Sequence, residues 1–242
     1  MRYVFYALGV LLGLILLFIL LVTVSSALVR EKEYDKNSKY YRFLLHSTTA
    51  IALKPARIKI HTSGIDKIPK DSRYLLVCNH RSKFDPIITW NILRGMDIAF
   101  ISKPENFDVP IYGRIIRKCC FMAIDRENPK NAIRTINKAA ELIKKDEVSI
   151  GVYPEGTRNY EEELLPFHNG VFKIAQRANV PVVVAAMRGT DSIKRNYPWK
   201  RSHVYFDVVD VLSAEYVKSN RTTAIGELVR GEIEAKIKEN RG

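Results

Sequence analysis

The stretch that decides the fold is YLLVCNHRSKFD, residues 74–85. Its first five residues, Tyr74 to Cys78, form an uninterrupted apolar run that is typical of a short buried strand. The residues from Pro86 to Leu93 have the pattern of a helix. His80 therefore lies where a strand ends and a turn begins, which is where α/β folds expose catalytic groups.

His80 is followed five positions later by a carboxylate, Asp85. A carboxylate close to an imidazole holds the ring in one tautomer and stabilises its charged form, as a general base requires. The pair alone is a weak signal, and a surface histidine beside an aspartate that caps a helix explains it better in an arbitrary protein. The rest of the chain decides between these two interpretations.

Short apolar runs alternate with helical stretches from Ile58 onward. This alternation predicts an α/β fold, with a mixed, largely parallel sheet flanked by helices. In such sheets the carboxyl ends of the strands gather at one edge and form the site. The expected strands are residues 57–61, 74–78, 98–102, 121–124, 149–153, 182–187 and 203–211, and the expected helices are 86–93, 111–118, 129–145, 170–178 and 222–240.

Further sequence blocks follow the histidine block in a fixed order. They are Gly113 with Ile124-Asp125-Arg126, then VYPEGTR at residues 152–158, and then Val180-Pro181. With Asn79-His80 and Asp85 they resemble the four ordered blocks of the glycerolipid acyltransferase family, over residues 57–212. The chain departs from the family near Val184, where a second proline is usual.

The resemblance implies transfer of a fatty acyl group from a thioester to the sn-2 hydroxyl of 1-acylglycerol 3-phosphate (lysophosphatidic acid), giving phosphatidic acid in phospholipid biosynthesis. His80 would take the proton from the hydroxyl and return it to the thiolate, with Asp85 orienting the ring. The donor would be acyl-CoA or acyl carrier protein, and neither a metal nor another cofactor is expected. Other lysophospholipids and glycerol 3-phosphate remain alternative acceptors.

The acceptor carries a phosphate, and the planar fork of an arginine matches that group. Arg126 and Arg158 are the first candidates, with Lys103 third. The spacing of Gly113 to Arg126 also fits the family, although Arg126 in a surface ion pair with Asp125 or Glu127 is the alternative.

By resemblance, Glu155 and Gly156 belong to the acceptor site too. Gly156 and Thr157 are expected to offer backbone N–H groups to a phosphate or an oxyanion. Glu155 as an ordinary turn residue after Pro154 is an equal alternative.

The amino-terminal segment has the composition of a membrane anchor. Residues 4–29 contain no charge, and about 20 apolar residues are enough to cross a bilayer as a helix. Residues 40–52 have an amphipathic pattern, with Arg42 and His46 off the apolar stripes. We expect a two-helix membrane element in residues 1–55 and a catalytic domain in residues 56–242, and both a spanning and a monotopic anchor remain open.

The chain is strongly basic, with a net charge of +13. The excess of Lys and Arg behind the apolar segment places the catalytic domain on the cytoplasmic side of the cell membrane if that segment spans it. The charge favours anionic membrane lipids as partners over nucleic acid, for which the sequence has no recognisable module. A non-catalytic, membrane-tethered protein that binds anionic lipid is the alternative of a different class. The three cysteines form neither a disulfide framework nor a zinc motif.

Overall fold

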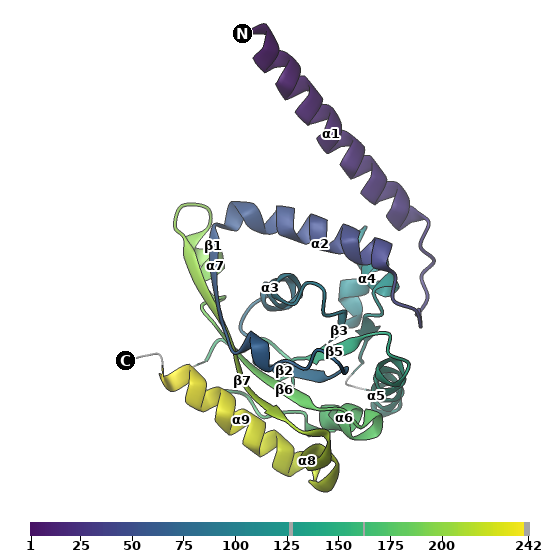
Figure 1. Ribbon diagram of the computed structural model, residues 1–242, viewed down its shortest axis with the longest axis vertical. Coiled ribbons are helices and arrows are strands. Elements are labelled where there is room, and N and C mark those ends of the chain that lie inside the picture. The colour runs from purple at the N-terminus through teal and green to yellow at the C-terminus, as the bar shows by residue number, and fades with distance from the viewer. Residues whose placement is uncertain (126–127, 162, 240–242) are drawn as a thin grey trace.

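The protein is seen in a computed structural model that describes residues 1–125, 128–161 and 163–239 (Figure 1). Its sheet has the strand order β1-β7-β6-β2-β5-β3-β4. Every neighbouring pair is parallel except β6 and β7, so the predicted mixed, largely parallel sheet is confirmed. The strands are β1 (Ile58–Ser63), β2 (Leu75–Cys78), β3 (Ile98–Ser102), β4 (Met122–Ala123), β5 (Ser149–Val152), β6 (Val182–Arg188) and β7 (Ser202–Leu212).

Helices cover both faces of the sheet, and the chain direction explains which face each helix takes. From β2 the chain moves through β3 to the edge strand β4, and then it returns through β5 to β6. Because parallel crossovers are right-handed, helices on the outward path lie on one face and helices on the return path lie on the other. The outward helices are α3 (Asp85–Ile92) and α4 (Tyr112–Lys118), and the return helices are α5 (Pro129–Lys144) and α6 (Lys173–Ala178).

The remaining elements complete these layers. In Figure 1, α2 (Lys39–Leu53) lies on the side of α3 and α4, whereas α8 (Ala214–Ser219) and α9 (Thr222–Glu239) lie with α6 on the opposite side. The other short elements are the helix α7 (Ser192–Asn196) and the 3₁₀ helices η1 (Lys54–Ala56), η2 (Ile65–Lys67), η3 (Pro104–Phe107) and η4 (Asn169–Phe172).

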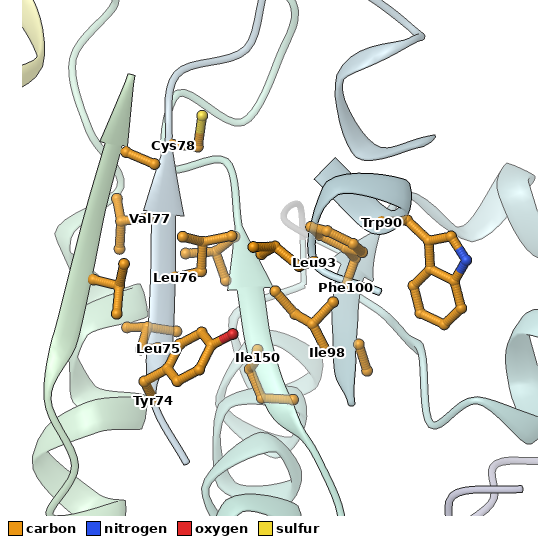
Figure 2. Packing of buried hydrophobic residues seen from close by; sticks show 14 of the residues in the cluster. Tyr74, Leu75, Leu76, Val77, Cys78, Trp90, Leu93, Ile98, Phe100 and Ile150 are labelled. Atoms are coloured by element: carbon orange, nitrogen blue, oxygen red, sulfur yellow. The ribbon is translucent and has the colours of Figure 1, made fainter. Parts of the chain in front are cut away.

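The core lies between the sheet and its helices. All four residues of β2 are buried, as expected for a central parallel strand covered on both faces. Figure 2 shows Leu75, Leu76 and Val77 among other buried side chains of the sheet, including Ile150 of the adjacent strand β5 and Phe100 of β3. The end of β2, which leads directly to His80, is therefore fixed by the buried core.

The predicted amino-terminal element consists of α1 (Arg2–Ala27) and α2 (Lys39–Leu53). Within the described residues, α1 is the one helix that is long and apolar enough to cross a membrane, and it projects away from the body (Figure 1). Its end meets α2 where the Ser25 Oγ and Tyr40 Oη hydroxyls lie 2.6 Å apart. The helix α2 packs on α3 and α4, so only one of the two helices is a possible span.

Arg42 and His46, which lie off the apolar stripes of α2 in sequence, are both buried. The Arg42 guanidinium is 3.1 Å from Asp97 Oδ1 and donates to the Ile98 carbonyl at 2.9 Å. It also lies over the ring of Trp90, and the His46 ring stacks on that indole at 4.4 Å. These partners allow α2 to turn a polar stripe toward the protein, which periodicity alone does not predict.

Candidate active site

The candidate site lies in a crevice between the ends of β2 and β5. These strands are hydrogen-bonded neighbours, but β2 leads to α3 on one face and β5 leads through η4 to α6 on the other. Connections that leave neighbouring strands toward opposite faces open a crevice at their carboxyl ends. His80 follows β2 and residues 155–158 follow β5, so the fold brings the two sequence blocks together.

The His80 ring is held by Asp85, as the five-residue spacing predicts. His80 Nδ1 lies 2.8 Å from Asp85 Oδ2, and the Asp85 side chain is fully buried at the start of α3. The same oxygen accepts the backbone N–H groups of Arg81 at 2.6 Å and Ser82 at 2.7 Å. A carboxylate bound in this way fixes Nδ1 as the protonated nitrogen and leaves Nε2 with a free lone pair.

The face of the imidazole packs on Tyr153. The two ring centroids are 4.5 Å apart, with 27° between the ring planes. The Tyr153 ring also stacks on Phe100, and its hydroxyl lies 3.2 Å from Thr89 Oγ1. Burial raises the pKa of the Tyr153 phenol well above its usual range, so the hydroxyl stays protonated. Tyr153 therefore acts as a wall that fixes the plane of the His80 ring.

The backbone of His80 is held at both ends by the segment after β5. Its N–H donates to Glu155 Oε1 at 2.7 Å, and its carbonyl accepts the Asn159 N–H at 2.8 Å. The second Glu155 oxygen accepts the Leu165 N–H at 3.1 Å, and Glu155 is only 3% exposed. Both oxygens of this carboxylate are thus occupied by the protein backbone.

A cavity of about 500 Å³ opens in front of His80. Among the described residues, the cationic side chains of Lys83, Lys103 and Arg158 line it, together with the turn residues Gly156 and Thr157. The structure therefore brings Lys103, Arg158, Gly156 and Thr157 to the same cavity as His80. Arg126 lies outside the described residues.

The two predicted site glycines have clear backbone roles. Gly156 has φ +74°, a conformation that favours glycine, and its N–H donates to the Tyr153 carbonyl at 3.0 Å. Gly113 lies in α4 against η3, where an added Cβ would stand 2.2 Å from the Phe107 carbonyl oxygen. Gly113 is therefore needed for the close approach of α4 to the segment that borders the cavity.

Sequence reasoning missed several residues that shape the site. Asn79 bonds both backbone groups of Met187, with Oδ1 accepting the N–H at 2.7 Å and Nδ2 donating to the carbonyl at 2.9 Å. Tyr153 and Asn159 are two more. Asn79 and Tyr153 stand within the quoted sequence blocks and Asn159 directly follows one, but their partners lie far along the chain, so the sequence assigned them no role.

Comparison with known proteins identifies the family. The family model described as Acyltransferase matches residues 59–188, which is more than half of the chain and includes His80, Asp85 and residues 155–158. The chain belongs to the acyltransferase family. The matched region runs from β1 to the end of β6, so the crevice lies entirely within it.

Two similar proteins carry the same enzyme name. The chain is 29% identical over 180 residues to a chloroplastic 1-acyl-sn-glycerol-3-phosphate acyltransferase of Brassica napus, covering 74% of this chain and 51% of that protein. It is 28% identical over 159 residues to the 1-acyl-sn-glycerol-3-phosphate acyltransferase of Haemophilus influenzae, covering 64% and 66%. The chain thus spans about half the length of the first relative and just under two thirds of the second.

A solved structure shares the fold of this acyltransferase. It is the crystal structure of the 1-acyl-sn-glycerophosphate (LPA) acyltransferase, PlsC, from Thermotoga maritima. The TM-score is 0.70 at 22% identity, and the match covers 90% of this chain and 86% of that one. The likeness therefore extends over nearly the whole fold.

Proposed function

We propose that this acyltransferase moves a fatty acyl group from a thioester to the sn-2 hydroxyl of 1-acylglycerol 3-phosphate, giving phosphatidic acid and a free thiol. The observation that carries the proposal is the ring of His80, which is fixed by buried Asp85 and lines a cavity with Arg158 and Lys103. The names of the relatives agree with this acceptor.

The chemistry needs one proton carrier and no covalent enzyme intermediate. His80 Nε2 takes the proton from the acceptor hydroxyl while the oxygen attacks the thioester carbonyl carbon. The C–S bond then breaks, and the departing thiolate takes the proton from His80. Asp85 holds the tautomer and stabilises the imidazolium, and a positioned base of this kind contributes about 10²–10⁴-fold.

We assign Glu155 a positioning role, because both of its oxygens accept backbone N–H groups. The Gly156 N–H is already used within its turn, so Thr157 is the better donor to the developing oxyanion or the phosphate. Arg158 and Lys103 bind the acceptor phosphate, with Arg126 as the further cation that the sequence predicts.

The setting of the reaction is a lipid surface. We propose that α1 anchors the chain in the cell membrane, with the catalytic domain of residues 56–242 on the cytoplasmic side. The acceptor then reaches the cavity from the membrane, whereas acyl-CoA or acyl carrier protein arrives from solution.

A thiol-release assay tests the proposal. Purified full-length protein in nanodiscs receives acyl-CoA or acyl carrier protein thioester with lysophosphatidic acid, other lysophospholipids or glycerol 3-phosphate. We expect thiol release that depends on lysophosphatidic acid, with phosphatidic acid as the product. Release that is fastest with a different acceptor reassigns the substrate. No release with any pair, while anionic lipid is still bound, favours the non-catalytic alternative.

A further inference from the structure

The connection between β6 and β7, residues 189–201, carries exposed aromatic and basic side chains on one short loop, which we call the β6–β7 loop. Trp199 is 83% exposed and Tyr197 is 53% exposed. Four basic residues of the same loop are also exposed, namely Lys194, Arg195, Lys200 and Arg201. Large aromatic side chains exposed together on one segment are typical of a surface that contacts a partner.

The loop is fastened to the body and braced internally, so its backbone follows a fixed course. Ile193 of α7 is fully buried and anchors the loop. Within the loop, the Tyr197 N–H donates to the Ile193 carbonyl at 3.0 Å and the Lys200 N–H donates to the Asn196 carbonyl at 2.7 Å. The aromatic and basic side chains therefore project from one braced stretch of backbone, and together we call them the loop surface.

This surface lies on the same side of the molecule as the apolar helix α1. Arg57, which follows η1 after α2, donates from Nη1 to the Trp199 carbonyl at 3.0 Å and joins the loop to the end of α2. Figure 1 shows the loop level with α2 and beside the end of that helix, with α1 rising from the body beyond the start of α2. The exposed face of α2 between them carries Phe43 and Ile51, exposed by 54% and 53%.

The loop also belongs to the edge of the sheet that carries the site. Strands β2 and β6 are parallel neighbours, and both end at this edge. The two hydrogen bonds between Asn79 and Met187 join these ends directly before His80 and just before the loop begins. Whatever the loop binds is therefore brought to the edge where His80 acts.

We propose that the β6–β7 loop is a second membrane contact, in which Trp199 and Tyr197 enter the bilayer interface and the four basic side chains bind anionic phospholipid headgroups. Trp and Tyr favour this interface because one end of the ring is apolar and the other is polar. Each nearby Lys or Arg strengthens binding to an anionic surface about fivefold.

The contact has a consequence for catalysis, and it rests on the proposed membrane function. The helix α2 has 15 residues and is thus about 22 Å long, with α1 near its start and the loop near its end. A domain held at both points cannot rotate freely about the single helix α1. Its site edge then faces the surface in which the acceptor hydroxyl lies.

Tryptophan fluorescence tests the contact independently of activity. The sequence has two tryptophans, and Trp90 is only 2% exposed, so Trp199 is the responsive one. Full-length protein in nanodiscs of phosphatidylcholine and phosphatidylglycerol is compared with and without acyl-chain-brominated lipid. We expect a quenched component that is absent in Trp199→Phe. A Trp199 emission that stays unquenched and typical of water overturns the proposal, whether or not the protein is active.

Charge variants test the consequence. The combined variant carries Lys194→Gln, Arg195→Gln, Lys200→Gln and Arg201→Gln. It should lower transfer to bilayer-embedded acceptor at least about tenfold and abolish the dependence of transfer on phosphatidylglycerol. The loss of two of the four charge contacts is enough for about a tenfold effect. Transfer to a short-chain acceptor that is monomeric in solution should be unchanged. The control is Lys218→Gln with Arg221→Gln, at the opposite end of β7, which should alter neither activity.

Two outcomes contradict the membrane contact in these assays. An equal loss with the soluble acceptor indicates damage to the site or the fold. A loss confined to acyl carrier protein as donor, with either acceptor, assigns the loop to that acidic protein. If the unaltered protein is inactive on both acceptors, the proposed function is wrong. The fluorescence measurement then tests the membrane contact by itself.

Discussion

The backbone N–H of His80 donates to the Glu155 carboxylate at 2.7 Å. These residues come from two separate sequence blocks that are 75 positions apart, and both follow neighbouring parallel strands. The contact means that the second block holds the histidine of the first in place, in addition to any contact it makes with substrate.

Glu155→Gln tests this positioning role. The amide replaces one acceptor oxygen by a donor, so one backbone N–H loses its partner. A buried charge-assisted hydrogen bond contributes about 1.5–3 kcal/mol, and we expect kcat to fall about ten- to hundred-fold. The KM for either substrate should change little. Exposed Glu163→Gln is the control, and a rise confined to the KM of the acceptor would instead support direct substrate binding.

Arg158→Ala should raise the KM for lysophosphatidic acid about ten- to hundred-fold while the KM for the acyl donor changes little. Arg158→Lys should restore only part of the affinity, because the planar fork is lost. Steady-state kinetics with both substrates varied give the two constants, and exposed Lys70→Ala is the control. Equal losses toward donor and acceptor would argue against a phosphate-binding role, and Lys103→Ala is then the next variant to measure.

Gly113→Ala tests whether this glycine serves packing. The new Cβ would meet the Phe107 carbonyl oxygen at 2.2 Å, so the free energy of unfolding should fall by about 1–3 kcal/mol. Gly231→Ala in α9 is the matched control, since its Cβ meets nothing within 4 Å and should stabilise the protein by about 0.5–1 kcal/mol. Denaturant unfolding measures both. Unchanged stability in Gly113→Ala with lost activity would point to substrate binding.

His46 predicts a stability that depends on pH. Burial, aided by the charge of Arg42, lowers the pKa of His46 from 6.5 to about 4. Between these values the unfolded chain binds a proton that the folded chain does not, so the free energy of unfolding should fall as the pH drops. Between a pH well above 6.5 and a pH well below 4, this effect lowers the free energy of unfolding by about 3 kcal/mol in total.

The variant His46→Phe keeps the stack on Trp90 and removes the titrating group. Its stability should change less between pH 7 and pH 4 than that of the unaltered protein. Exposed His168→Gln is the control and should keep the original pH dependence. An identical pH profile in His46→Phe would show that another group causes the loss.

Much of the fold can be predicted from the sequence because its helices and strands are recognisable from local patterns of residues. Each expected strand and each expected long helix is present, since apolar runs and helical patterns depend on neighbouring residues. The helices α7 and α8 were missed because five or six residues are too few to show a period. The burial of Arg42 was missed because its partner Asp97 lies 55 positions away.

In the site, too, the sequence predicts contacts between residues that are close in the chain and misses contacts between distant ones. The contact of His80 with Asp85 is local and follows from their spacing, and the structure places it at 2.8 Å. The bonds of Glu155 are not local, so a carboxylate after a turn suggests a substrate ligand although the protein backbone occupies both oxygens. The cavity that Lys103 and Arg158 both line depends on the order of the strands in the sheet. Local sequence patterns do not reveal that order.

The most direct test is the turnover of His80→Ala. Full-length protein in nanodiscs is given acyl-CoA and lysophosphatidic acid, and free thiol is measured over time. We predict that kcat falls by about 10²–10⁴-fold or more, because the substitution removes the group that takes the hydroxyl proton. Thermal unfolding and retention in the membrane should match the unaltered protein. Turnover near that of the unaltered protein would contradict the role of His80 as the base.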